Sequence, residues 1–186
     1  MPDPQANTLS PAQQLLSDLW DEHMRHEFAT KDTTATLATM VEDAHVNHVP
    51  VMTGGAGRGE LQVFYARHFI PKMPPDFAVV PVARTIGTDR LVDEIIARFT
   101  HSVVMDWLLP GVPPTGRPVA LPIVVSVEFR DGKLCDERIY WDQASVLVQV
   151  GLLDPANLPV VGAQSAQKIL DPSRPYNELI ERAAHG

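Results

Sequence analysis

The residues that could carry proton chemistry in this sequence are two glutamates and two histidines set among apolar residues. Glu137 alternates with Ile139 and Trp141 in a segment rich in strand-forming residues, so these three side chains should share one face of a strand. Burial against such a face would raise the pKa of the carboxyl group and suit it to general acid or base catalysis near neutrality. The alternative is a glutamate at a strand edge that pairs with Arg138 or another surface charge.

Glu94, His101 and His48 complete the candidate catalytic set. Two carboxylates that converge in a dry pocket could share a proton or divide the acid and base roles, although Asp93 and Glu94 could simply solvate the start of a strand. His101, in an apolar run, could shuttle protons because its ordinary pKa is about 6.5, or it could be a hydrogen-bonded core residue. His48 could contact the pocket, or it could hydrogen-bond to the backbone of its own loop.

Large apolar and aromatic side chains could line a pocket for a flat or lipophilic small molecule, although most aromatic stripes in proteins are plain core. The candidate ligand-binding residues are Trp20, Tyr65, Phe69, Trp107, Ile139 and Trp141. Asp142 is better explained as the cap of the helix that follows it than as a catalyst.

Other motifs argue against several classes of site. The pairs His45–His48 and His23–His26 are each three residues apart but have no carboxylate at a ligand-like third position, so we predict no metal site and no cofactor. The glycine-rich run at 54–59 has neither the Lys-Ser/Thr of a phosphate-binding loop nor the spacing of a dinucleotide turn, which favours a hinge or a pocket-rim loop. The sequence contains no Gly-x-Ser-x-Gly elbow of a serine hydrolase.

Composition is typical of a globular protein. The chain has 186 residues, 45% hydrophobic and 20% charged, with a net charge of -8. Because its fifteen Lys and Arg residues are scattered, we expect no nucleic-acid partner. A single cysteine, Cys135, and the lack of a signal peptide or a long apolar run predict a cytoplasmic protein without a membrane partner.

The order of the predicted elements indicates an α+β fold. Ser10-Pro11-Ala12-Gln13 forms a capping box before an amphipathic helix, and helices are expected from Asp32 to about Val41 and over 60–70. An extended segment over 45–51 lies between the last two. Four long runs then predict an antiparallel meander of strands over 77–87, 90–104, 119–130 and 133–141, followed by a helix after Asp142. Helices before an antiparallel sheet predict a curved sheet that wraps around the helices.

Three segments are expected: a disordered lead over 1–9, a domain over 10–153, and a tail over 154–186 that packs on the domain or on a partner subunit. Within the domain, Gly132-Lys133-Leu134, Tyr140-Trp141-Asp142 and Gln149-Val150-Gly151-Leu152 resemble the nuclear-transport-factor-2-like superfamily, and most closely its SnoaL-like polyketide cyclase branch. Parts of the chain also look like domains associated with dienelactone hydrolases, through segments such as His48-Val49-Pro50 and Phe69-Ile70-Pro71.

The resemblance implies a conical cup whose pocket is lined by the concave face of the sheet, in a fold shared by enzymes and by non-catalytic binders. It implies a polar pocket residue at His48 and places Glu94 where epoxide hydrolases have a charged pocket pair. The working carboxylate of the cyclases and epoxide hydrolases falls at Ile139, a departure for which Glu137 could compensate.

Two functions are therefore expected. One is a cofactor-free acid–base isomerase, cyclase or hydratase that acts on a small apolar carbonyl compound. The other, favoured by Ile139, is a non-catalytic small-molecule binding or accessory module that functions as a homodimer.

Overall fold

The computed structural model describes residues 9–185; the expected disordered lead lies outside them except for Leu9. The elements in chain order are α1 (Pro11–Arg25), η1 (His26–Thr30), α2 (Thr33–Ala38), β1 (Met40–His48), β2 (Thr53–Ala56), α3 (Gly57–Val63), η2 (Phe64–Phe69), η3 (Ile70–Lys72), β3 (Ala78–Ile86), β4 (Arg90–Thr100), β5 (Pro118–Arg130), β6 (Lys133–Trp141), α4 (Gln143–Gln149), α5 (Gln164–Leu170) and α6 (Glu178–His185). This mixed α and β content confirms the predicted fold class.

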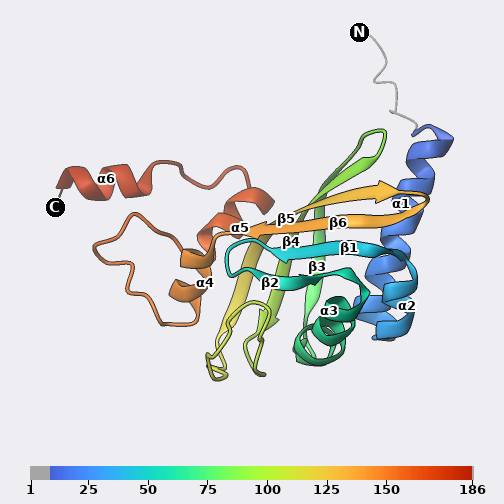
Figure 1. Ribbon diagram of the computed structural model, residues 1–186. Helices are drawn as coiled ribbons and strands as arrows, with labels where there is room; N and C mark the ends of the chain where they lie inside the picture. The colour runs from blue at the N-terminus through green and yellow to red at the C-terminus, as the bar shows by residue number, and fades with distance from the viewer. Residues whose placement is uncertain (1–8, 186) are drawn as a thin grey trace, which may run out of the picture.

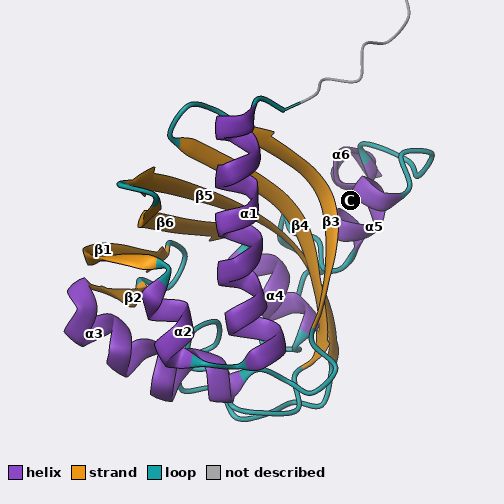
Figure 2. Cartoon of the chain, turned by 90° about the vertical axis from the view of Figure 1, so that its right-hand side faces the viewer, coloured by secondary structure: helices purple, strands orange, loops and turns teal. Residues whose placement is uncertain are grey.

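The described residues form one curved sheet with strand order β2-β1-β6-β5-β4-β3. Strands β3 to β6 are the predicted antiparallel meander, with neighbouring strands joined by short turns or by the long loop between β4 and β5. Helix α1 lies across one face of this sheet, and α2 and α3 lie near one end of it (Figure 2). The apolar core therefore sits between the helices and the concave face.

Sequence patterns missed the two strands at one edge of the sheet. The segment predicted as a short extended stretch is the long strand β1, which runs parallel to β6, and part of the glycine-rich run is β2, antiparallel to β1. Glycine explains why such a segment can be a strand. Gly54 has φ +140°, and a Cβ at that position would lie 2.0 Å from the carbonyl oxygen of Val46, so only glycine lets β2 approach β1 this closely.

Helix α1 begins at the predicted capping box, in which the side chains of Ser10 and Gln13 satisfy each other's backbone N–H groups. At its other end the helix widens into the π-helical turn η1, which contains the buried Glu27. π-helical turns of this kind are rare and are frequent at functional sites. The end of α1 therefore places Glu27 where it can take part in a functional site.

The tail adds two short helices. Helix α5 packs against β5, and the hydroxyl of Ser145 in α4 donates a hydrogen bond to the carbonyl of Gly162 before α5. Helix α6 lies farther from the sheet (Figure 1), and Arg182 joins it to the carbonyls of Pro155 and Leu158. Among residues 9–185, no helix has both the length and the apolar composition that crossing a membrane requires.

Candidate functional site

The concave face of the sheet and α1 enclose a small, mainly apolar cavity. The space open to the centre of a water-sized sphere is about 40 Å³, which is room for a few waters or a small organic group. Three ionisable residues, Glu27, His48 and Glu137, interrupt its apolar wall. The rest of the wall is formed by Trp20, Met24, Phe28, Phe69, Phe77, Val79, Ile95, Trp107, Ile123, Val125 and Ile139.

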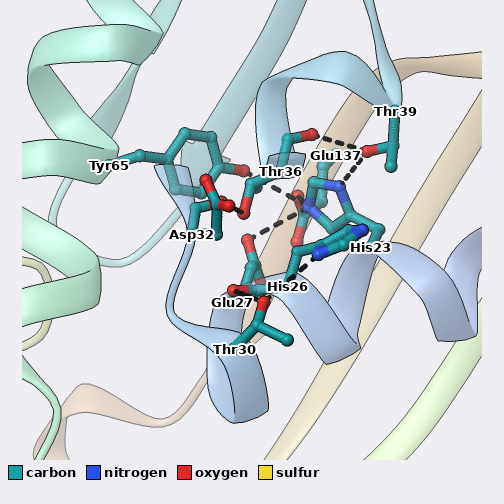
Figure 3. A network of polar contacts seen from close by, with 9 residues as sticks. All are labelled: His23, His26, Glu27, Thr30, Asp32, Thr36, Thr39, Tyr65 and Glu137. Carbon is teal, nitrogen blue, oxygen red and sulfur yellow. Dashed lines mark hydrogen bonds and ion pairs between the residues drawn. The ribbon is translucent and has the colours of Figure 1, made fainter. Parts of the chain in front are cut away.

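A buried polar network lies behind this wall, centred on His23 (Figure 3). Its Nε2 atom is 3.0 Å from Oε1 of Glu27, one helical turn farther along the chain, and 3.8 Å from Oε2 of Glu137 on β6. The hydroxyl of Tyr65 lies 3.5 Å from the same nitrogen, and the indole ring of Trp20 stacks on the imidazole with ring centroids 5.5 Å apart. Two carboxyl groups and one imidazole are thus held together out of water.

The tautomer of His23 follows from its second nitrogen. Nδ1 is 2.6 Å from the hydroxyl of Thr39, and that hydroxyl donates its hydrogen to the carbonyl of Thr36, also at 2.6 Å. The hydroxyl has only one hydrogen, so Nδ1 must be the donor in its contact with Thr39. Nε2 therefore presents either a lone pair or a second proton to the two glutamates.

We expect replacement of Thr39 by Val to lower the free energy of unfolding by about 1–3 kcal/mol, because it leaves the N–H of His23 buried without an acceptor. Replacement by Ser keeps the hydroxyl and should restore most of this loss. Denaturant unfolding measures both variants, and ¹⁵N NMR of the imidazole should show the Nδ1–H tautomer in the wild type and the Ser variant. Equal destabilisation by Val and Ser would contradict this role of the hydroxyl.

Glu137 is the least satisfied member of the network. Its side chain is 7% exposed, and its Oε2 atom has no hydrogen-bond partner among the described residues. Burial and the neighbouring charge of Glu27 raise the pKa of Glu137 to about 8, although the charge of His23 acts in the opposite direction. Near neutrality this carboxyl group is therefore mostly protonated and can both give and take a proton.

Burial acts in the same direction on His23 and His48, but their neighbours give the two histidines opposite net pKa shifts. Burial alone would lower the pKa of His23, but Glu27 and Glu137 outweigh it, so the net shift is upward. Burial lowers the pKa of His48 to about 4, opposed only by the hydrogen bond from its Nδ1 to the carbonyl of Thr53. His48 is therefore a neutral hydrogen-bonding group in the cavity wall at neutral pH.

These pKa shifts make the free energy of unfolding depend on pH. The folded state keeps a proton on Glu137 up to about pH 8, whereas the unfolded chain releases it near its ordinary value of 4.5. Folding therefore binds protons between these limits, and the resulting stability is lost as pH rises through the folded pKa. His48 acts in the opposite sense, since its folded pKa is depressed, but only below its ordinary value of 6.5.

We therefore expect the free energy of unfolding to fall between pH 6.5 and 8, by at most about 1.4 kcal/mol per pH unit for the Glu137 proton. The neutral variant Glu137→Gln should lose this part of the slope. Urea unfolding at a series of pH values measures both proteins, and parallel pH profiles for the two would contradict the assignment.

The structure brings together two of the four predicted catalytic residues. Glu137 and His48 both line the cavity, from the neighbouring strands β6 and β1. Glu94 does not line it, because it precedes Ile95, a lining residue of β4, and adjacent side chains of a strand point to opposite faces.

His101 also lies outside the cavity wall. It is buried at the end of β4, and its Nδ1 accepts a hydrogen bond from the backbone N–H of Thr115 and contacts the hydroxyl of the same residue at 3.1 Å. Its backbone pairs with Arg117 and Gly116. This histidine therefore joins the two ends of the loop between β4 and β5.

The predicted ligand-binding residues also fall into two groups, those that line the cavity and those that lie behind its wall. Trp20, Phe69, Trp107 and Ile139 line the cavity. Tyr65 and Trp141 are one layer farther out: the hydroxyl of Tyr65 faces His23, and the ring of Trp141 packs edge-on against His48 with centroids 5.7 Å apart.

Sequence reasoning missed Glu27 and Thr39, and it considered His23 only for its spacing from His26, which does not suit a metal site. His23 is buried on the apolar face of α1, and its neighbour in the structure is Glu27, four residues on. Residues at this spacing share a helix face, so a His-x-x-x-Glu pair on the buried stripe was the available signal. Glu137 reaches His23 only because β6 packs against α1, and no local signal in the sequence indicates this contact between distant elements.

Comparison with known proteins places this chain in a family. Residues 21–137, more than half of the chain, match the model of the SnoaL-like domain. No curated protein sequence matches the chain.

Solved structures show the same fold. A candidate SnoaL-like polyketide cyclase from Jannaschia sp. CCS1 is 20% identical, with a TM-score of 0.62 over 80% of this chain and 99% of that one. A candidate polyketide cyclase from Xanthomonas campestris pv. campestris is 19% identical, with a TM-score of 0.57 over 75% and 98% of the two chains. The epoxide hydrolase/cyclase-like enzyme SalBIII, with a role in pyran ring formation in the polyether salinomycin, is 15% identical, with a TM-score of 0.54 over 69% and 92%. These structures confirm the predicted cup fold. The family match confirms the predicted SnoaL-like resemblance, and the chain belongs to the SnoaL-like domain family.

Proposed function

We propose that the chain is an enzyme that performs acid–base isomerisation, cyclisation or hydration of a small apolar carbonyl compound, without a cofactor. The observation that carries the proposal is the buried carboxyl group of Glu137 on the wall of a mainly apolar cavity, where its Oε2 atom has no hydrogen-bond partner among the described residues. Burial raises the pKa of this group and so favours its neutral form. A neutral carboxylic acid in such a place can donate a hydrogen bond to a carbonyl oxygen or exchange a proton with the neighbouring carbon.

The size and lining of the cavity support a small and uncharged substrate. Its wall is mainly apolar and contains no Lys or Arg, so an anionic ligand would lose hydration without gaining a matching cation there. Trp20 and Trp107 offer flat surfaces, and His48 offers a neutral ring nitrogen beside them. The naming of SalBIII as cyclase-like supports the same reaction class.

Deuterium exchange tests the proposal without a known substrate. Small cyclic ketones and enones are incubated with the protein in D₂O, and NMR follows the loss of protons on the carbon next to the carbonyl. We expect exchange above the rate in buffer for ketones small enough for the cavity. A panel that binds without any enhanced exchange would overturn the catalytic proposal.

The second candidate is a non-catalytic binding module that functions as a homodimer. Ile139 favours it, since this apolar side chain lines the cavity where the resemblance places the working carboxylate of the cyclases and epoxide hydrolases. Val124 and Tyr140, 39% and 42% exposed on the outer face of the sheet, offer apolar surface for a second copy. Quenching of tryptophan fluorescence by ketones that undergo no exchange would favour this function, and the mass in solution tests the dimer.

A further inference from the structure

The cluster of His23, Glu27 and Glu137 has the composition and spacing of a cation site as well as of a proton site. Each residue offers one ligand atom, and these atoms all lie within 4.8 Å of one another. One imidazole and two carboxylates form the mixed nitrogen and oxygen set that suits first-row divalent metals such as Zn²⁺.

The distances are those that a small cation needs. Bonds of about 2.05 Å in a tetrahedral site place neighbouring ligand atoms about 3.3 Å apart. The two separations from Nε2 of His23, 3.0 Å to Glu27 and 3.8 Å to Glu137, lie on either side of that value. The third separation, between the ligand oxygens of Glu27 and Glu137, is at most 4.8 Å. Rotation of the two carboxyl groups toward each other would therefore bring the three atoms around one ion.

Two independent features point the same way. First, Oε2 of Glu137 is buried without a hydrogen-bond partner among the residues described, so an acceptor faces the cluster unused. Second, Nδ1–H of His23 is held by Thr39, which directs Nε2 toward the glutamates. Histidine ligands of metals commonly donate their other N–H to such an outer partner, which fixes the ring and its tautomer.

We propose that His23, Glu27 and Glu137 bind one Zn²⁺ ion. A neutral imidazole and two carboxylates carry two negative charges, which one divalent ion balances inside an apolar wall. Glu27 and Glu137 line the cavity, so the remaining coordination positions of the ion face the space where a water or a small ligand would enter.

Binding of this kind must displace protons, because the ligand atoms of a bound metal are deprotonated. The apparent affinity should therefore rise with pH. The ion-loaded protein also has no acidic proton on Glu137, so Zn²⁺ should inhibit the ketone exchange described above. Binding of Zn²⁺ at this site does not depend on whether the protein catalyses the exchange.

Cobalt(II) serves as a visible probe for the zinc site. The full-length protein is treated with a chelator, freed of it, and titrated with Co²⁺ at pH 6 and pH 8. We expect one equivalent to give the intense visible absorption of four- or five-coordinate cobalt, to be displaced by Zn²⁺, and to bind at least tenfold more tightly at pH 8.

Three variants make the result specific. Glu137→Gln and Glu27→Gln should each weaken binding at least tenfold, and thermal melting confirms that they fold. The matched control is Glu22→Gln, since Glu22 is 52% exposed and pairs with His26 at the same four-residue spacing. Unchanged affinity in both cluster variants, or only the weak spectrum of octahedral cobalt, would overturn the proposal. Exchange by the chelator-treated protein tests the catalytic proposal separately.

Discussion

Replacing Glu137 with Gln is expected to lower the rate of catalysed deuterium exchange by about 10²–10⁴-fold, the usual contribution of a positioned general acid or base. Gln matches the size of the protonated carboxyl group and carries no charge, so it suits a wall where burial already favours the neutral form of Glu137. It can still donate a hydrogen bond but cannot transfer a proton. Binding measured by tryptophan fluorescence should therefore change much less than the rate.

Glu94→Gln is the matched control for this variant. It removes a carboxylate from the same sheet, but from the strand face opposite to the cavity-lining Ile95. We expect its exchange rate to stay within about twofold of the wild type, because its side chain points away from the cavity in which exchange would occur. If Glu137→Gln exchanges as fast as the wild type while Glu94→Gln does not, the acid has been assigned to the wrong glutamate.

The contrast between these two glutamates shows what sequence patterns can predict. Alternation along β6 correctly grouped Glu137 with Ile139, because the period of a strand is local and needs no knowledge of its neighbours. For Glu94 the same period left open which face was buried. That choice was made by Ile95 and by α1, which packs across the concave face and is separated from β4 by more than sixty residues.

Long-range pairing also explains what was missed at the edge of the sheet. Strand β1 is parallel to β6, and parallel strands need a long connection, so no hairpin signal joins them. This pairing sets Val46 beside Glu137 and His48 beside Ile139. The sequence could indicate His48 as a candidate residue. Its position near Glu137 depends on this pairing of distant strands and became visible only in the folded chain.

Replacing Asp93 with Ala is expected to lower the free energy of unfolding by about 2–4 kcal/mol. This lies between the cost of one unsatisfied buried donor and that of breaking a fully buried ion pair, because the Arg84 side chain is 28% exposed. Asp93 is 5% exposed and accepts hydrogen bonds from the indole N–H of Trp20 at 2.7 Å and from two guanidinium nitrogens of Arg84 at 2.6 and 2.7 Å. Alanine leaves the indole N–H buried without an acceptor and part of the guanidinium unpaired. Urea unfolding measures the loss.

Asp21→Ala is the matched control, because Asp21 binds the same guanidinium at 2.8 Å but is 61% exposed. An exposed ion pair contributes about 1 kcal/mol or less, so equal losses in the two variants would contradict the role given to the buried acceptor.

The loss of Asp93 should also affect the cluster of His23, Glu27 and Glu137. Trp20 stacks on His23 and lines the cavity, so freeing its ring in Asp93→Ala should weaken Co²⁺ binding although no ligand has changed. A cluster that depends on this support is held by the packing of α1 on β4 as much as by its own three residues.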